Sequence, residues 1–564
     1  MLEPLPESTA DLLTWDWNQF EPLANELLAR PLSAANSAEW LQDWSNWGAY
    51  LLELYNRLYL ATSQDTQDFA AEQAYTRYVE QIYPASLAAD QALKQKFIAS
   101  GLEPAGFAVA LRNLRAEMAL YREQNLPLLS EEQKLCNEYD KITGVQTVLW
   151  DGEERTIAQL FTVYQETDRD RREQAWRLAA ERQLYDRPAL NELWARMLGV
   201  RQQLAVQTDL PDYRAYRWQQ LLRFDYSPHD CHLFHEAIET EVVPVARQIY
   251  ERRRQQLGVS VLRPWDLDVD VLGRAPLRPY QNITELKSRT AAIFHQVDDQ
   301  LGAHFDTIVA EGLLDLENRK DKAPGGYCTD FPVVRRPFIF MNAVGVHNDV
   351  QTLLHEGGHA FHVFESHAIH LLQLLQVPME FAEVASMSME LLASPYLAST
   401  GGFYSAADAA RARVEHLENS LLFWPYMAVV DAFQHWAYEN PAAAAEAENC
   451  DAAWTDLWQR FMPGVDWGGL EDVQATGWQR KLHIFTVPFY YVEYGLAQLG
   501  AVQVWRNALS DQAGAVARYR QALALGGSVP LRQLYQAAGA RLAFDCAALA
   551  EAVSLMKSKV EELS

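Results

Sequence analysis

The sequence predicts a mostly α-helical protein that divides into two or more subdomains. At 564 residues, the chain is longer than a single hydrophobic core usually serves. Long runs with helical periodicity and charged faces extend from the N-terminus to about residue 255, separated by short turns. Almost all of the chain after residue 345 has the same periodicity, which confines the predicted strands to about residues 263–345.

The strand region ends in a stretch of β-forming residues, from Phe331 to Met341, which is expected to form a hairpin or paired strands. Pro337 cannot donate to a sheet ladder, so the strand at 338–342 is expected at an edge of its sheet. An open edge can bind an extended peptide through main-chain hydrogen bonds. The alternative is a hairpin that only supports the helix after it.

That next predicted helix contains His355, Glu356 and His359 in the order His-Glu-x-x-His. The two histidines lie one turn apart on the same face, so both imidazoles can reach one metal ion, with Glu356 beside the vacant coordination position. This arrangement is typical of zinc peptidases. The alternative is a buried helix with two core histidines.

Two further features belong to this helix. Asn348 or Asp349 can cap its start with a side-chain oxygen. Gly357 and Gly358 each cost about 1 kcal/mol relative to alanine in a helix interior. Their presence indicates that something approaches the helix closely at this point.

A catalytic zinc ion usually has three protein ligands and one water. His362 is excluded as the third ligand, because it lies about 10 Å along the helix axis from His355. The predicted helix at 377–397 supplies carboxylates, and Glu383 and Glu390 share one of its faces. One could bind the metal while the other holds a ligand histidine by its second ring nitrogen. Spacing does not choose between them, and both could be part of a solvated face.

These motifs resemble the thimet oligopeptidase and oligoendopeptidase F family of zinc peptidases, and specifically its oligoendopeptidase F and Pz-peptidase branch. The resemblance is carried by HEGGHAFH at 355–362, FAEVASMSME at 381–390, the stretches at 319–345 and 478–501, and ALGGSVPLRQLYQAAG near the C-terminus. By this match Glu383 is the third zinc ligand, which leaves Glu390 as the carboxylate behind a ligand histidine.

The same resemblance implies a two-lobed helical metallopeptidase with a small β-sheet beside the zinc-binding helix. A helical N-terminal lid, residues 1–200, and a catalytic domain, residues 201–564, would enclose a deep substrate channel. Such a channel admits short unfolded peptides and excludes folded proteins.

The resemblance also gives a histidine and a tyrosine from 478–501 the task of stabilising the oxyanion of amide hydrolysis. His483 matches this histidine, and we favour Tyr490 and Tyr494, four apart on one helical face, over Tyr491. The alternative is a cluster of aromatic core residues. The residues that we expect to bind substrate are Gly325, Gly326, Tyr327, Phe340 and Tyr491.

The predicted function is therefore a zinc-dependent oligoendopeptidase with one Zn²⁺ per chain, in which Glu356 is the general base. A di-metal carboxylate protein would need a second Glu-x-x-His pair besides Glu356 and His359, and the sequence contains none. A purely structural zinc site would normally have four Cys or His ligands, and no cysteine lies in this stretch.

Composition restricts the other possibilities. A net charge of −27 disfavours nucleic acid as a partner. The N-terminal residues carry acids and no signal-peptide pattern, and no stretch approaches 18 uninterrupted apolar residues, so neither secretion nor a membrane is expected. Five cysteines, widely spaced, fit a reducing cytoplasm better than a disulfide framework. The oligomeric state cannot be derived from the sequence.

Overall fold

Two compact units, each assembled from three separate segments, make up the chain. The computed structural model describes residues 6, 8–65, 67–319, 322–323 and 325–564. Unit 1 contains Met1–Ala119, Leu277–Ala410 and Gly500–Leu542, and unit 2 contains Leu120–Pro276, Arg411–Leu499 and Ala543–Ser564. The boundary predicted at residue 200 falls within unit 2, and the division into a lid and a catalytic domain stays a prediction.

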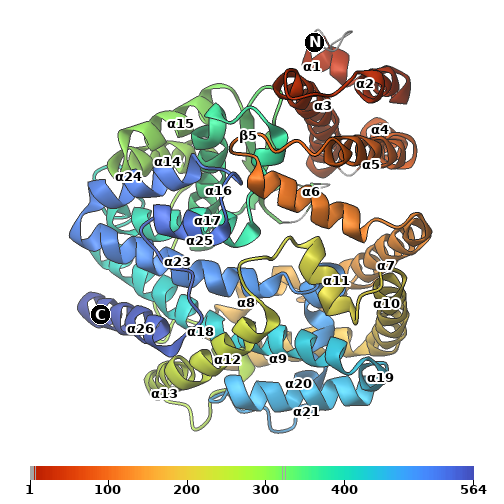
Figure 1. Ribbon diagram of the computed structural model, residues 1–564. Helices are drawn as coiled ribbons and strands as arrows, with labels where there is room; N and C mark the ends of the chain where they lie inside the picture. Colours follow the sequence, from red (N-terminus) through yellow and green to blue (C-terminus); the bar gives the residue numbers. More distant parts are fainter. Residues whose placement is uncertain (1–5, 7, 66, 320–321, 324) are drawn as a thin grey trace. The chain divides into compact units, whose positions relative to one another are not determined.

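Unit 1 is mostly helical (Figure 1). Its described residues also form a three-stranded sheet. Its elements are α1 (Thr9–Leu12), α2 (Trp17–Ala29), α3 (Ser37–Gln64), α4 (Phe69–Arg77), α5 (Tyr83–Ala99), α6 (Ala108–Leu120), α14 (Ile283–Val297), α15 (Asp299–Ala310), β3 (Leu314–Glu317), β4 (Tyr327–Phe331), β5 (Arg336–Ala343), α16 (His347–Glu365), α17 (Met379–Ala393), α24 (Gln512–Leu523) and α25 (Leu531–Ala537). In the N-terminal helices, a core cluster that includes Trp40, Trp44 and Phe97 is buried.

The sheet of unit 1 has the strand order β3-β5-β4, with β3 parallel and β4 antiparallel to β5. The predicted hairpin is confirmed as β4 and β5, but the prediction that residues 338–342 form an edge strand is wrong. β3 begins at Leu314, opposite Ile339, and the Ile339 N–H donates to the carbonyl of Leu313. Pro337 precedes this paired stretch, so its missing N–H interrupts no hydrogen bond to β3. β5 is therefore the central strand, and β3 and β4 form the two edges of the sheet.

Unit 2 is helical except for one short hairpin. Its elements are α7 (Leu126–Gly144), β1 (Thr147–Trp150), β2 (Glu153–Thr156), α8 (Phe161–Tyr164), α9 (Arg169–Tyr185), α10 (Arg187–Gln207), α11 (Tyr213–Gln220), α12 (Pro228–Glu241), α13 (Val243–Leu257), α18 (Ala406–Glu439), α19 (Pro441–Ala444), α20 (Ala447–Phe461), α21 (Glu471–Ala475), α22 (Leu482–Thr486), α23 (Tyr491–Ser510) and α26 (Cys546–Leu563). Helices α18 and α23 also have residues in unit 1.

The hairpin β1-β2 lies outside the region in which strands were predicted, so that restriction to residues 263–345 is wrong. Its signal is present in the sequence, because Asp151-Gly152 follows three β-forming residues and both have positive φ, +51° and +84°. This is the pair of dihedral signs that a two-residue hairpin turn requires. The prediction of a mostly α-helical fold with a small sheet is otherwise confirmed.

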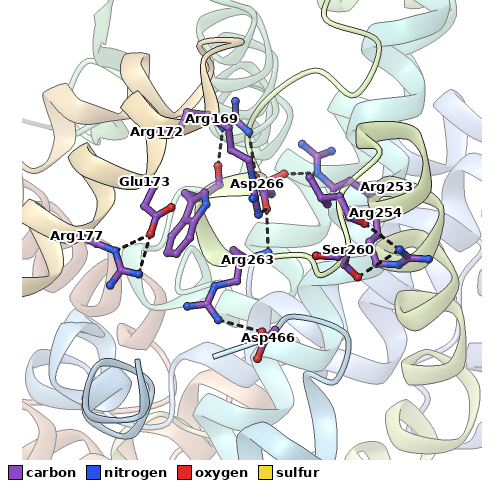
Figure 2. Close-up of polar contacts among 12 residues, drawn as sticks. Arg169, Arg172, Glu173, Arg177, Arg253, Arg254, Ser260, Arg263, Asp266 and Asp466 are labelled. Atoms are coloured by element: carbon purple, nitrogen blue, oxygen red, sulfur yellow. Dashed lines mark hydrogen bonds and ion pairs between the residues drawn. The ribbon is translucent and has the colours of Figure 1, made fainter. Parts of the chain in front are cut away.

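A buried carboxylate organises part of unit 2. Asp266 accepts hydrogen bonds from Arg169 at 2.9 and 2.8 Å and from Arg172 at 3.0 Å, which attaches the loop after α13 to α9 (Figure 2). Arg263, in the same loop, pairs with Asp466 at 3.0 Å. Because Asp266 and Arg172 are both shielded from water, each stabilises the charge of the other.

Among the described residues, none of the helices combines the length and the apolar character that a bilayer span requires.

Candidate active site

The zinc-binding motif lies on α16, as predicted, and the start of this helix is fixed by Asp349. One carboxylate oxygen of Asp349 accepts hydrogen bonds from the N–H groups of Val344, Gly345 and Val346 at 2.8–2.9 Å, and the hydroxyl of Tyr280 donates to the same oxygen. Of the two predicted capping residues, Asp349 is therefore the one that caps the helix, from its third position.

The two glycines inside α16 explain how the metal-ligand helices meet. A Cβ atom on Gly358 would lie 2.5 Å from the Cα of Ser386 and 2.6 Å from the carbonyl oxygen of Ala385, both in α17. A Cβ atom on Gly357 would lie 2.6 Å from the ring of Phe294. The predicted close approach is thus confirmed, and α16 and α17 are neighbours in unit 1 (Figure 1).

This close approach brings three donor atoms together. The Nε2 atoms of His355 and His359 lie 3.4 and 3.7 Å from Oε2 of Glu383. Two ligands about 2.1 Å from one tetrahedral ion would be separated by roughly 3.4 Å. His355, His359 and Glu383 therefore fit a single zinc-sized ion.

Glu390 contacts the His355 ring at the nitrogen that faces away from the three donor atoms. Its Oε1 atom is 2.7 Å from Nδ1 of His355, on the opposite side of the ring from Nε2. This contact places the proton of a neutral imidazole on Nδ1 and leaves Nε2 as the metal-binding atom. The geometry separates the two carboxylates whose roles the spacing alone left open.

The electrostatics of the group follow from burial and from these contacts. Burial disfavours the carboxylate of Glu383, but His355, His359 and Ser386 outweigh it and lower its pKa to about 2. Burial likewise disfavours a charged His355, yet Glu383 and Glu390 raise its pKa well above the usual value. The pKa of His359 is lowered to about 4, chiefly by burial. The cluster therefore favours a negative carboxylate facing at least one neutral imidazole.

Glu356 is buried beside these donors and has an uncommitted oxygen. The backbone N–H of Cys328, in β4, donates to its carboxyl group, while Oε2 has no hydrogen-bond partner in the part of the chain that the structure describes. Burial raises the pKa of Glu356 to about 7, because the charged form loses its hydration. The sequence reasoning missed the contact with Cys328, since it depends on the pairing of β4 within the sheet.

Three of the predicted substrate-binding residues, Gly325, Gly326 and Tyr327, lie at the start of β4, and Phe340 lies opposite Tyr327 in β5. Gly325 has φ of +96° and Gly326 precedes Tyr327, the first residue of the strand. The ring of Tyr327 stacks on that of Phe340 with centroids 4.9 Å apart. Phe340 is fully buried in a cluster with Phe331 and other apolar residues, so it supports Tyr327 rather than presenting its own ring. Substrate contact at this position stays a prediction.

His483 and the three tyrosines belong to unit 2 and form a cluster of their own. The His483 ring centroid lies 6.1 Å from Tyr490, 4.9 Å from Tyr491 and 6.0 Å from Tyr494. Lys481 donates to the Tyr491 hydroxyl at 2.9 Å. Burial, and then the charge of Lys481, lower the pKa of His483 to about 4, so its imidazole is neutral near pH 7. The part of these residues in catalysis stays a prediction.

Unit 2 contains other potential metal ligands, in groups that include His435 with Asp431 and Cys231, or with His232 and Glu439. We assign no metal to them. The guanidinium of Arg214 lies 3.3 Å from Nδ1 of His435 and pairs with Glu439, and a fixed positive charge opposes a cation there.

Comparisons with known proteins are consistent with this geometry. The model of peptidase family M3 matches residues 162–553. The structure of Pz peptidase A with an inhibitor is 27% identical, with a TM-score of 0.89, and the match covers 100% of this chain and 98% of that one. A structure named oligoendopeptidase F is 28% identical, with a TM-score of 0.88 and coverage of 99% and 98%.

Another structure of that name, from Bacillus anthracis str. Ames, has a TM-score of 0.86 at 23% identity, with coverage of 97% and 96%, and shows the same fold. No match was found among curated protein sequences. Because the family model covers more than half of the chain, the protein belongs to peptidase family M3 and is a metallopeptidase that acts on peptides.

Proposed function

We propose that this metallopeptidase is a zinc-dependent oligoendopeptidase that hydrolyses internal bonds of short unfolded peptides. The observation that carries the proposal is the convergence of His355, His359 and Glu383 beside an uncommitted oxygen of Glu356. Two imidazoles and one carboxylate are a ligand set of catalytic zinc sites, which keep a fourth position open. A structural zinc site would have a fourth protein ligand instead.

The ion would be held by His355, His359 and Glu383, while Glu390 orients the first of these. A zinc ion held there would supply Lewis-acid chemistry, lowering the pKa of the attacking water and polarising the peptide carbonyl. Glu356 accepts a proton from the attacking water on its free oxygen as the new C–O bond forms. The same carboxyl group then donates that proton to the leaving nitrogen as the C–N bond breaks. Glu356 alone therefore carries the proton from the attacking water to the leaving nitrogen.

His483 and a tyrosine, Tyr490 or Tyr494, would stabilise the oxyanion. A neutral imidazole with one N–H and a phenol O–H are suitable donors, because preorganised donors lower the energy of a developing negative charge. The low pKa of His483 supports this role, and its Nδ1 atom is buried without a partner in the described part of the chain. Tyr491, whose hydroxyl accepts from Lys481, would contact the substrate instead.

The substrate class rests on resemblance and on the strand beside α16. The names of the similar structures support cleavage at internal bonds. We propose that residues 1–200 act as a lid, that 201–564 carry the catalysis, and that Gly325, Gly326 and Tyr327 border the bound peptide.

We also propose that the protein acts in the cytoplasm. None of its five cysteines forms a disulfide, which is typical of proteins in a reducing compartment.

An internally quenched peptide of about 10 residues with blocked termini tests the proposal. We expect cleavage at an internal bond, loss of cleavage after dialysis against a chelator, and recovery with about one zinc ion per chain. Cleavage unaffected by the chelator, or release of terminal residues only, would contradict it. A folded protein of similar composition serves as the control for substrate size, and it should be cut far more slowly.

A further inference from the structure

The chain between His483 and Tyr490 leaves the helical hydrogen-bond pattern for one turn. Helix α22 ends at Thr486 and α23 begins at Tyr491. The last four carbonyl groups of a helix have no partner within that helix, and buried carbonyls need one. The buried residues of this segment, Ile484, Phe485, Pro488 and Phe489, therefore depend on donors from other elements.

Arg201, in α10, supplies donors to the first half of this segment. Its Nη1 atom lies 3.4 Å from the carbonyl oxygen of Ile484, and Nη2 donates to the carbonyl of Phe485. The side chain is fully buried, and Glu132, 2.8 Å from Nε, balances its charge. Nη1 also donates to the hydroxyl of Tyr438 at 2.9 Å. A planar guanidinium held on several sides fixes the carbonyls that it contacts.

Arg217 and Arg223 supply donors to the second half. Nε of Arg217, in α11, lies 3.1 Å from the carbonyl oxygen of Pro488. Arg223 donates to the carbonyl of Phe489 and forms a buried ion pair with Glu493, in the first turn of α23. The segment and the helix that follows it are thus held by the same guanidinium.

The residue before Tyr490 has an unfavourable backbone conformation. Phe489 has φ of +64°, which a residue with a side chain adopts only when its surroundings enforce it. Its N–H donates to Oε1 of Gln434 at 2.7 Å, and its carbonyl accepts from Arg223. Both backbone groups of Phe489 thus form hydrogen bonds with side chains outside the segment. These contacts fix the backbone conformation of Phe489.

We propose that Arg201, Arg217 and Arg223, here called the arginine clamp, are positioning residues that orient the His483 imidazole and the Tyr490 phenol before a peptide binds. This inference rests on the oxyanion-stabilising roles proposed above for these two side chains. Preorganised donors act only when they are correctly placed, and a displacement of about 1 Å can lower a rate about 10²-fold. The clamp fixes the backbone on both sides of this turn.

Arg217→Met is the mildest test, because it removes the donor to Pro488 and keeps most of the apolar side chain. We expect kcat for the quenched peptide to fall about 10- to 100-fold, with KM, zinc content and Tm close to wild type. Arg217→Lys should recover part of the loss. The matched control is Arg214→Met in the same helix, whose ion pair is with Glu439, and which should keep wild-type kcat.

Arg223→Met combined with Glu493→Gln tests the buried pair, since it removes both charges and leaves neither uncompensated. If this double variant does not fold, the Arg217 series decides the question. Wild-type kcat in Arg217→Met, or a loss of zinc that accounts for its lower rate, would overturn the proposal.

A second background separates positioning from general damage. In His483→Ala, Arg217→Met should cause little further loss of kcat, because the side chain that it positions is already gone. The same fold-loss in both backgrounds would overturn the clamp. If His483→Ala itself has wild-type turnover, the proposed role of His483 is wrong, and Tyr490→Phe becomes the background. Wild-type turnover in both His483→Ala and Tyr490→Phe would overturn the proposed arginine clamp as well.

Discussion

Nδ1 of His355 lies 2.7 Å from Oε1 of Glu390, while Nε2 of the same ring faces Glu383 at 3.4 Å. One imidazole thus contacts two carboxylates through its two nitrogens. The first contact selects the tautomer, and the second places the lone pair of Nε2 where a metal ion would bind. Glu383 is therefore expected to bind the metal ion, and Glu390 to orient His355.

Glu383→Gln should weaken zinc binding more than Glu390→Gln does. The first variant replaces a negatively charged ligand with a neutral amide, whereas the second disturbs only the orientation of His355, an effect typically worth 10- to 100-fold in affinity. Competition with a chelator of known affinity measures both. Equal losses, or a larger loss in Glu390→Gln, would show that the roles are reversed.

Glu356→Gln should keep zinc and lose most of its turnover. The amide cannot accept the proton of the attacking water, and general-base catalysis typically contributes about 10²- to 10⁴-fold. Metal analysis and kcat on the quenched peptide are measured on the same preparation. A variant that retains zinc and cleaves at the wild-type rate would exclude Glu356 as the base, while a variant without zinc would show that it has a structural role.

Gly358→Ala should destabilise the protein even though alanine favours helices by about 1 kcal/mol relative to glycine. The new methyl group would meet the backbone of Ser386 and Ala385 at 2.5–2.6 Å, so α16 and α17 must move apart, at a cost of about 1–3 kcal/mol. We expect a lower Tm and weaker zinc binding, because the ligands come from both helices.

The control for that substitution is Gly199→Ala in α10, where an added Cβ would meet nothing within 4 Å. It should leave Tm unchanged or raise it slightly. A similar Tm for both variants would mean that the close approach at Gly358 does not limit the packing of α17.

The lowered pKa of Asp315 predicts how the stability of the folded protein depends on pH. Burial opposes ionisation of this carboxyl group, but Arg319, Lys322 and Gln64 outweigh it and lower its pKa to about 2. The unfolded chain takes up this proton at a higher pH, near the usual value of about 3.9. The contribution of Asp315 to the free energy of unfolding is therefore present above about pH 5 and is lost as the pH falls from about 4 to about 2.

Thermal unfolding of wild type and Asp315→Asn at several pH values measures this effect. We expect a lower Tm for the variant at pH 7 and a difference that shrinks below pH 4. A difference that stays constant down to pH 2.5, under conditions where both proteins unfold reversibly, would show that the ionised carboxylate is not the source of the stability.

The sequence alone determined the helical class, the position of the His-Glu-x-x-His helix and the close approach at Gly357 and Gly358. These properties depend on local spacing and on the conformational preferences of single residues, which are visible along the chain. The same kind of local signal, Asp151-Gly152, marks the turn of the hairpin β1-β2.

Tertiary structure decided which side chains meet. Glu383 and Glu390 share a helical face, and only the packing of α17 against α16 shows which histidine nitrogen each one contacts. The position of β5 at the centre of its sheet depends on where β3 begins, which Pro337 does not reveal. The arginine clamp joins residues more than 260 positions apart, and arginines that bind backbone carbonyls leave no pattern in the sequence. Contacts of this kind depend on packing between distant elements, which local spacing does not encode.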